Sequence, residues 1–386
     1  METTTQITKL NKRNIRAIIR NPEKSAEAVN LVYVRDTVPG IKRVKRGRDF
    51  IYLHKNKPVK DPAILSRIKS LVIPPAWENV WICTLTNGHL QATGVDVKKR
   101  KQYKYHSSWS DLRNQTKFYR LLEFGKAIPA IREKVEKHLA LTGLPLNKVL
   151  ATVVSLMEHT SIRVGNNMYE KLYGSYGLTT LKDKHVTWNG TTMKFSFKGK
   201  KGVAQKISIT SKRLSRIVKQ CRDIPGKELF QYYDDQGNHK SIDSGMVNQY
   251  LKNITGQDFT AKDFRTWSGT LHALMAFKQF GCARTKAETK KNILAALDLV
   301  AGHLGNTRTV CKKYYVHPLV ITLYESSGLE KYLQQVSSLE KNNGMKGLTI
   351  DEKVMMHILG KETSSNTFTT TQVAIQTCTY PLPGNS

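Results

Sequence analysis

A tyrosine near the C-terminal end of this chain and basic or amide residues upstream of it provide the side chains needed for phosphodiester chemistry. A phenol can attack phosphorus if guanidinium groups neutralise the phosphate and an acid protonates the leaving oxygen. The candidate nucleophile is Tyr315, the candidate phosphate ligands are Arg163 and Arg265, and the further donors are Lys200, Lys262 and Asn306. The overall charge of the chain indicates where the phosphate would come from.

Each of these residues, taken singly, also fits an ordinary structural role. Arg163 follows an apolar helical stretch and could have a buried ion-pair partner. Lys200 lies in a glycine-flanked turn, where most lysines are simply exposed. Lys262 and Arg265 are three positions apart, so a helix would place them on one side, facing either one anion or solvent. The combination, rather than any single residue, indicates phosphate chemistry.

The spacing of Asn306 and Tyr315 restricts the backbone between them. On one straight helix, residues nine positions apart would be separated by about 13 Å along the axis and would point in roughly opposite directions. The two side chains can share a site only if this segment bends or leaves the helical conformation. Gly305 and Pro318 favour such a short, broken segment.

The composition indicates a polyanionic partner. The formal net charge is +32. A generic basic surface would explain part of this excess, but nucleic acid is the expected partner. One basic run is interleaved with aromatic and amide side chains and comprises Lys98, Lys99, Arg100, Lys101, Gln102, Tyr103 and Tyr105. It would contact phosphates, sugars or bases; the alternative is a solvated edge strand with its tyrosines on the core face.

Several signatures are missing from the sequence, and their absence predicts chemistry without a cofactor. The chain has no phosphate-binding GxxxxGK[ST] loop, no HExxH and no Cys/His cluster, so neither ATP nor a metal is expected. The five cysteines form no CxxC pair, which suits a reducing cytoplasm. There is no apolar run of membrane-spanning length and no secretory signal, so no membrane is expected as a partner.

The elements that must position these residues predict an α+β fold. The expected parts are a basic arm over 1–28, a small, mainly β domain over 29–106, a larger, mainly α domain over 107–328, an extension with a short helix over 329–360, and a disordered tail over 361–386. The loosely ordered arm and the tail are both polar.

Strands and helices follow from periodicity and turn residues. Strands are expected at 31–34, 50–54, 80–83 and 89–93, and helices at 111–125, 127–139 and 149–157. A hairpin turning at Asn189-Gly190 is expected next, and helices should dominate from Ser211 to about Tyr324. Thr349 to Glu352 is typical of a capping box, and Gly360 of the end of that last helix.

Taken together, these residues resemble the type IB DNA topoisomerases of the poxvirus-like, bacterial kind over roughly residues 30 to 325. The order of the motifs carries the resemblance: Ile-Arg-Val-Gly-Asn at 162–166, Gly-Leu-Thr-Thr-Leu-Lys at 177–182, Phe-x-Gly-Lys ending at Lys200, Lys-x-x-Arg-Thr at 262–266, and Gly-Asn-Thr at 305–307 with a tyrosine nine residues after the asparagine.

The resemblance implies a role for each site residue. Arg163 and Arg265 would hold the scissile phosphate, and Tyr315 would form a 3′-phosphotyrosyl link. Lys200 and Lys262 would help to protonate the 5′-oxygen. Asn306 stands where poxvirus enzymes carry histidine, and its amide would donate a hydrogen bond in the transition state. Gln102, Tyr103, Tyr105 and Tyr169 resemble positions that contact DNA.

The resemblance also implies an architecture and a reaction. The two domains would form a clamp around duplex DNA, and the protein would be a monomer in the bacterial cytoplasm, associated with the nucleoid. The free strand end would rotate before religation, and no ATP would be consumed because the covalent link retains the phosphodiester energy.

Two alternatives remain at this point. A tyrosine site-specific recombinase would share the catalytic set, but recombinases usually carry His-x-x-Arg where this chain has Lys262-Asp263-Phe264-Arg265. A non-enzymatic DNA-packaging protein would fit the charge and the aromatic residues, and it would form no covalent intermediate with DNA.

Overall fold

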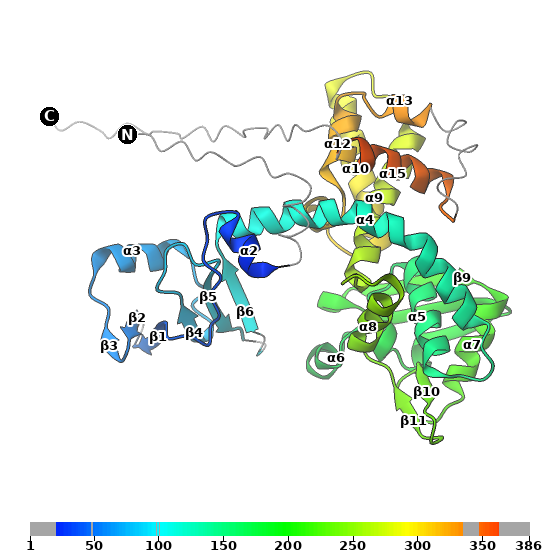
Figure 1. The fold of residues 1–386 in the computed structure, drawn as a ribbon, viewed down its shortest axis with the longest axis horizontal. Helices are drawn as coiled ribbons and strands as arrows, with labels where there is room; N and C mark the ends of the chain where they lie inside the picture. The colour runs from blue at the N-terminus through cyan, green and yellow to red at the C-terminus, as the bar shows by residue number, and fades with distance from the viewer. Residues whose placement is uncertain (1–20, 48, 98, 100, 335–346, 363–386) are drawn as a thin grey trace.

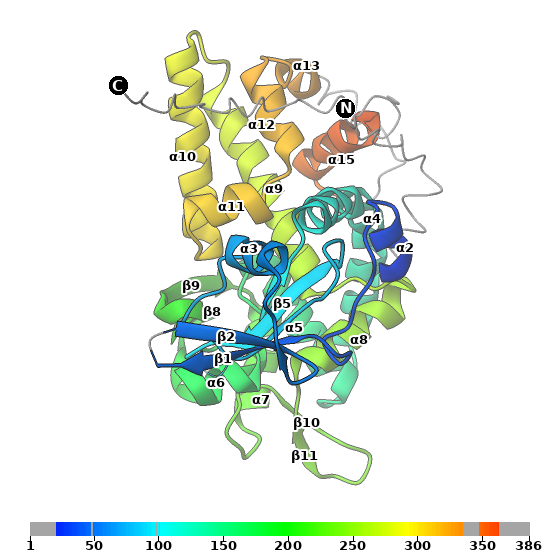
Figure 2. The same ribbon diagram turned by 90° about the vertical axis from the view of Figure 1, so that its left-hand side faces the viewer.

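The computed structural model describes residues 21–334 and 347–362, apart from residues 48, 98 and 100. An N-terminal β sheet and a larger, mainly helical part are joined by the long helix α4 (Ser107–Leu139), so the fold is mixed α+β as predicted (Figure 1). The sheet and the lower region of the helical part lie on the same side of α4, towards its two ends (Figures 1 and 2).

The N-terminal sheet has six strands in the order β3-β2-β1-β4-β5-β6, and its neighbouring strands are antiparallel. The strands are β1 (Ile41–Arg46), β2 (Asp49–His54), β3 (Lys57–Pro58), β4 (Glu78–Ile82), β5 (Leu90–Val95) and β6 (Lys101–Tyr105). Helix α3 (Pro62–Ser70) adds Ile68 to a small core that also contains Ile41, Val80 and Ile82. This core is separate from that of the helical part.

Two expectations for the N-terminal region are wrong. Residues 22–27 are not a loose arm but helix α2 (Pro22–Glu27), because Asn21 accepts hydrogen bonds from the first turn and Ala26 is buried against Trp109. Residues 31–34 do not form a strand. Val32 makes only an isolated bridge to Gly88, and the amide of Val34 bonds the His89 ring instead of a neighbouring strand.

Helix α4 runs unbroken where two helices were predicted. Gly125 was expected to end the first of them, but its missing side chain serves packing, since a Cβ there would collide with the Trp267 ring and the Met356 sulfur. Pro129 lies inside the helix as well. The helix therefore tolerates both residues because tertiary contacts along its length compensate for their weak local propensity.

The helical part is built around the buried helix α5 (Leu146–Thr160). The other helices are α6 (Asn167–Tyr173), α7 (Lys212–Arg222), α8 (Ser244–Thr255), α9 (Ala261–Phe280), α10 (Lys286–Leu304), α11 (Arg308–Tyr314), α12 (Pro318–Glu325), α13 (Glu330–Leu333) and α15 (Ile350–Glu362). The short 3₁₀ segments are η1 (Leu178–Thr180), η2 (Asp183–His185) and η3 (Lys200–Gly202).

A three-stranded antiparallel sheet interrupts these helices. It consists of β7 (Val186–Asn189), β8 (Thr192–Lys198) and β9 (Ala204–Thr210). The predicted hairpin is confirmed, although its turn falls at Gly190-Thr191, one residue later, because Asn189 still pairs with Thr192. A second hairpin, β10 (Gln231–Tyr233) with β11 (His239–Ser241), falls in a region that was predicted to be helical.

The capping box of the last helix is confirmed. The amide of Thr349 donates to the Glu352 carboxylate at 2.8 Å, and the amide of Glu352 donates to the Thr349 hydroxyl at 3.3 Å. The helix continues two residues past the predicted end at Gly360. Of the predicted tail, residues 363–386 lie outside the described residues, as do residues 1–20 of the predicted arm.

Candidate active site

Arg163 lies in a loop that the end of α5 creates. Ser161 adopts the left-handed conformation (φ 53°), which turns the chain out of the helix. The amides of Leu178 and Thr179 then donate to the carbonyls of Arg163 and Val164, at 2.9 and 2.7 Å. The Gly-Leu-Thr-Thr motif of the sequence therefore holds the Arg163 loop in place through backbone hydrogen bonds.

Arg265 projects from the second turn of α9 and is buried, with 5% of the residue exposed. Its Nη2 donates to the Leu304 carbonyl at 2.7 Å, and its Nη1 donates to the Ser161 carbonyl. The guanidinium carbon lies 5.2 Å from the centre of the Tyr315 ring. The end of α5, the end of α10 and helix α9 thus meet at this one side chain.

The backbone between Asn306 and Tyr315 is broken, as their spacing predicted. Helix α10 ends at Leu304, and Gly305 adopts the left-handed conformation (φ 57°) before α11 begins at Arg308. Tyr315 follows the last residue of α11. Nη2 of Arg163 donates to the Gly305 carbonyl at 3.2 Å and to the side-chain oxygen of Asn306. Asn306 is thereby joined to the same group of side chains.

Lys200 lies at the tip of the β8–β9 hairpin, where Lys201 takes a positive φ of 62° and the amide of Gly199 donates to the Val203 carbonyl. Its Nζ lies 5.9 Å from the centre of the Tyr169 ring. One cavity of about 250 Å³ is lined by most of the predicted set: Arg163, Tyr169, Lys200, Lys262, Arg265 and Tyr315. The fold therefore brings together residues that are far apart in the sequence.

The electrostatics of this cavity favour an anion. Burial, together with the nearby charge of Arg265, lowers the pKa of Arg163 to about 10; burial also lowers the pKa of Arg265. Both guanidinium groups still carry their charge at neutral pH. Within the described part of the chain, neither arginine forms an ion pair with a carboxylate. Two desolvated cations without a negative partner are expected to bind an anion.

Two buried donors at the site point to the same conclusion. Nε of Arg265 and the amide nitrogen of Asn306 have no hydrogen-bond partner among the described residues. Buried donors are nearly always satisfied, and an orphaned one costs about 1–3 kcal/mol. Phosphate oxygens would satisfy both donors, and their lone pairs suit a guanidinium especially well.

The site contains two residues that the sequence analysis missed. Gly269 and Thr270 lie about one turn after Arg265 on α9. A Cβ at Gly269 would lie 2.8 Å from the Tyr315 carbonyl oxygen, and the Thr270 hydroxyl donates to that oxygen at 3.2 Å. These residues hold the backbone of Tyr315. The signal in the sequence was the pair of small residues that follows the arginine on one helix.

Of the predicted DNA-contact residues outside the cavity, Lys101, Gln102, Tyr103 and Tyr105 lie on β6, the edge strand of the N-terminal sheet. Tyr103 and Tyr105 are exposed and their rings stack, with centroids 5.9 Å apart. The alternative that placed these tyrosines on the core face is therefore wrong. An edge strand with two exposed, parallel rings offers a surface on which sugars or bases could stack.

The polar neighbours of these tyrosines are less available for contacts with DNA than predicted, because three of them already bind carboxylates. Lys101 forms an ion pair with Asp36 and Lys99 forms one with Glu78, each at 2.6 Å, while the side-chain amide of Gln102 donates to Asp96 at 2.9 Å. Lys98 and Arg100 lie outside the described residues. The carboxylates come from other strands and loops, which is why the local run of basic residues did not reveal them.

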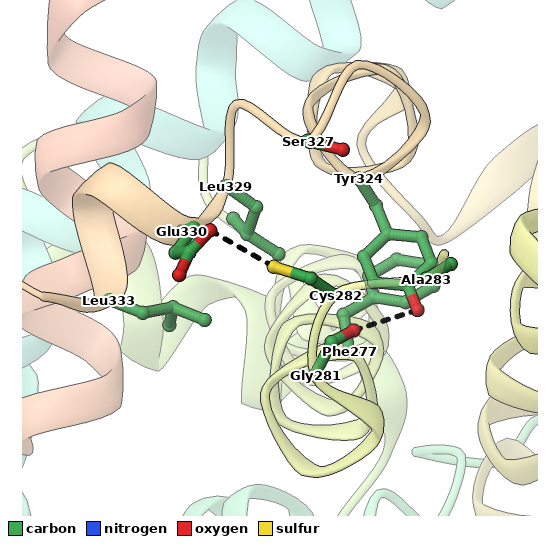
Figure 3. Close-up of a pocket in the computed structure, with 9 residues that line it drawn as sticks. All are labelled: Phe277, Gly281, Cys282, Ala283, Tyr324, Ser327, Leu329, Glu330 and Leu333. Atoms are coloured by element: carbon green, nitrogen blue, oxygen red, sulfur yellow. Dashed lines mark hydrogen bonds between the residues drawn. The ribbon is translucent and has the colours of Figure 1, made fainter. Parts of the chain in front are cut away.

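Neither Cys311 nor Cys282 is a rival nucleophile. Cys311 is fully buried next to the site, and burial raises the pKa of its thiol to about 11, as expected for a packed residue. Cys282 lies at a separate cavity of about 160 Å³ between α9, α12 and α13 (Figure 3). It donates to Glu330 at 3.1 Å, and this carboxylate raises the pKa of the thiol.

Among residues 21–334 and 347–362, no group of three or more His, Cys, Asp or Glu side chains is arranged to hold a metal ion. None of the helices in the same ranges is both long enough and apolar enough to span a membrane.

Comparison with known proteins matches both parts of the chain. The family model described as "Eukaryotic DNA topoisomerase I, catalytic core" matches residues 106–343, which is more than half of the chain, and "Bacterial DNA topoisomerase IB, N-terminal domain" matches residues 49–96. DNA topoisomerase 1B of Acanthamoeba polyphaga mimivirus is 33% identical over 297 residues, covering 75% of this chain and 88% of the viral protein.

The chain belongs to the type IB DNA topoisomerase family. Poxvirus relatives are more distant: DNA topoisomerase I of monkeypox virus and DNA topoisomerase 1B of vaccinia virus are each 23% identical over 249 residues, covering 64% of this chain and 76% of theirs. Membership of this topoisomerase family decides against the recombinase and packaging alternatives. Because a bacterial domain model and viral relatives both match, the bacterial source stays a prediction.

Proposed function

We propose that this type IB topoisomerase relaxes supercoiled duplex DNA through a transient break in one strand. The observation that carries the proposal is the placement of Tyr315 in one cavity with the buried Arg265 and the partly buried Arg163, neither of which has a carboxylate partner in the described structure. A phosphodiester is the anion that would use both the arginines and the phenol.

The reaction assigns one task to each residue. The Tyr315 oxygen loses its proton to water and attacks phosphorus, a 3′-phosphotyrosyl bond forms, and the bond to the 5′-oxygen breaks. Arg163 and Arg265 stabilise charge on the non-bridging oxygens, and the Asn306 amide donates a hydrogen bond to one of them. Lys200 and Lys262 supply a proton to the 5′-oxygen. Religation reverses each step after the free end has rotated.

The reaction needs no energy source, because the phosphotyrosyl ester keeps the energy of the broken phosphodiester. Every group assigned above is a side chain of this chain, so neither a nucleotide nor a metal has a step to perform. The same argument requires only one protomer for a complete site, and we expect a monomer acting where DNA is found in the cytoplasm, on the nucleoid.

The arrangement of the sheet and the lower region of the helical part supports binding of DNA from two sides. Both lie on the same side of α4 (Figure 1), and the exposed Tyr103 and Tyr105 belong to the sheet while Tyr169 lines the cavity of the helical part. We infer a clamp in which these tyrosines contact one duplex. Replacing Tyr103 and Tyr105 by alanine should weaken binding to a duplex; unchanged affinity would argue against this surface.

The activity is tested with a negatively and a positively supercoiled plasmid in EDTA without nucleotide. Relaxation of both is expected, together with protein covalently attached to a 3′-phosphate after rapid denaturation. A strict requirement for Mg²⁺ or ATP, or attachment to a 5′-phosphate, would refute the mechanism. Relaxation of a plasmid with no special sites also separates this activity from recombination.

A further inference from the structure

A hydrogen-bonded cluster of Ser161, Ser268 and His303 lies next to the groups that hold Arg265. The Ser161 hydroxyl lies 2.8 Å from the Ser268 hydroxyl and 3.0 Å from Nε2 of His303, and the Ser268 hydroxyl lies 3.2 Å from the same Nε2. None of these residues belongs to the catalytic set assigned above. The cluster joins the end of α5, the middle of α9 and the end of α10.

The cluster is attached to both acceptors that orient Arg265. Nη1 of Arg265 donates to the carbonyl of Ser161 itself, and Nη2 donates to the carbonyl of Leu304, the residue after His303. The bond between Ser161 and His303 therefore ties together the two backbone segments that carry these carbonyls. Without it, the end of α10 could move relative to the end of α5, and the guanidinium would lose its fixed direction.

The contacts of His303 and its uncharged form are consistent with a role in holding these two backbone segments together. Its ring stacks on His272, with centroids 3.7 Å apart, and His272 in turn bonds the Ser268 carbonyl at 2.8 Å. Burial, together with the nearby His272 and the charge of Arg265, lowers the pKa of His303 to about 4. At neutral pH the imidazole is therefore uncharged, so it can bond Ser161 without adding a second cation next to the guanidinium.

We infer that Ser161 and His303 are positioning residues of the cleavage reaction, whose hydrogen bond holds in place the two carbonyl groups that aim Arg265 at the phosphate. The inference rests on the proposed function. Its physical basis is that a phosphate ligand displaced by about 1 Å can lose about a hundredfold in rate. Neither residue touches the reacting atoms, so their effect must pass through Arg265.

The first test is single-turnover cleavage of a duplex oligonucleotide by the full-length protein. His303→Leu should slow cleavage about tenfold or more and slow religation to a similar degree, while affinity for the duplex stays within about twofold. His303→Gln should restore most of the rate, because an amide can still bond the Ser161 hydroxyl. The matched control is His159→Leu, since His159 is exposed and bonds only the Ser155 carbonyl of its own helix.

The second test is a double-mutant cycle with Arg265→Lys, which keeps the charge but loses the two-nitrogen fork. If the cluster acts by aiming that fork, His303→Leu should cost less than about twofold in the Arg265→Lys background. A full, independent loss in both backgrounds would overturn the inference in favour of a general structural role. Should His303→Leu fail to fold, Ser161→Ala removes the same bond by deleting one oxygen.

The proposed function and the positioning role of Ser161 and His303 are refuted by different outcomes. A wild-type protein that cleaves no duplex would refute the proposed function and this inference with it. A wild-type protein that cleaves, while His303→Leu and Ser161→Ala cleave at the wild-type rate, would refute the inference alone.

Discussion

The guanidinium carbon of Arg265 lies 5.2 Å from the centre of the Tyr315 ring, and both residues are held by the same helix. Arg265 belongs to α9, and Thr270 of α9 bonds the Tyr315 carbonyl at 3.2 Å. One rigid element thus sets the distance between a phosphate ligand and the proposed nucleophile. Such fixed geometry is what a reaction that relies on positioning and charge stabilisation requires.

The nucleophile is tested by removing one oxygen. We predict that Tyr315→Phe abolishes covalent attachment to DNA while binding of the duplex survives, because the ring and its packing remain. Attachment is measured by denaturing electrophoresis and binding by a mobility shift. The control is Tyr314→Phe, since Tyr314 is more than a third exposed and follows Lys313 on α11. An inactive Tyr314→Phe beside an active Tyr315→Phe would move the nucleophile by one residue.

The proposed acid is tested with an altered leaving group. We predict that Lys200→Ala slows cleavage much more than it weakens binding, because one phosphate contact among many carries little affinity. A substrate with sulfur at the 5′-bridging position needs no acid and should restore much of the lost rate. Arg163→Ala should gain little from sulfur, since charge on the non-bridging oxygens still needs a ligand. Equal rescue of both variants would contradict this division of roles.

The close approach of Gly269 to the Tyr315 backbone is tested by adding one methyl group. We predict that Gly269→Ala slows cleavage about a hundredfold, because the added methyl would lie 2.8 Å from the Tyr315 carbonyl oxygen and displace the phenol. The control is Gly302→Ala on α10, where an added methyl meets no atom within 4 Å. That change should leave the cleavage rate intact and stabilise the helix by about 0.5–1 kcal/mol. Single-turnover rates and thermal denaturation measure both effects.

The pH dependence of stability is tested at Glu352, which is almost fully buried against α4 and α9. Burial alone would raise the pKa of this carboxyl, but hydrogen bonds from Arg132 and the Thr349 amide outweigh it, and the net pKa is lowered. Since the folded-state pKa is below the unfolded value of 4.5, the stabilisation is present above pH 4.5 and is lost as the pH falls through the folded-state pKa.

Glu352→Gln should therefore lower the free energy of unfolding at pH 7 by about 3 kcal/mol, the usual cost of breaking a buried pair. The difference from wild type should shrink in more acidic buffer. Thermal denaturation followed by tryptophan fluorescence measures it at each pH. Glu133→Gln is the control, because Glu133 pairs with Lys137 on the open surface and its loss should change the melting temperature little. An equal effect of Glu352→Gln at all pH values would disprove the linkage.

The features that depend on neighbouring residues could be predicted from the sequence. Alternating β-formers predicted β2, β4 and β5, the residues around Gly190 predicted the β7–β8 hairpin, and Thr349 with Glu352 predicted the start of α15. Turns, caps and periodicity act within a few positions, so they can be recognised in the chain alone. The ordered motifs also identified the family, which the comparisons then confirmed.

The features that depend on contacts between distant segments became visible only in the tertiary structure. The helix end predicted at Gly125 is absent, because α9 and α15 pack against this glycine within α4. Lys99 and Lys101 of the basic run pair with carboxylates from other segments of the N-terminal part. The hydrogen bonds from Arg265 to the carbonyls of Ser161 and Leu304 join three helices that are far apart in the chain. Long-range contacts of this kind leave no local pattern, because burial and pairing are properties of the packed fold and not of neighbouring residues.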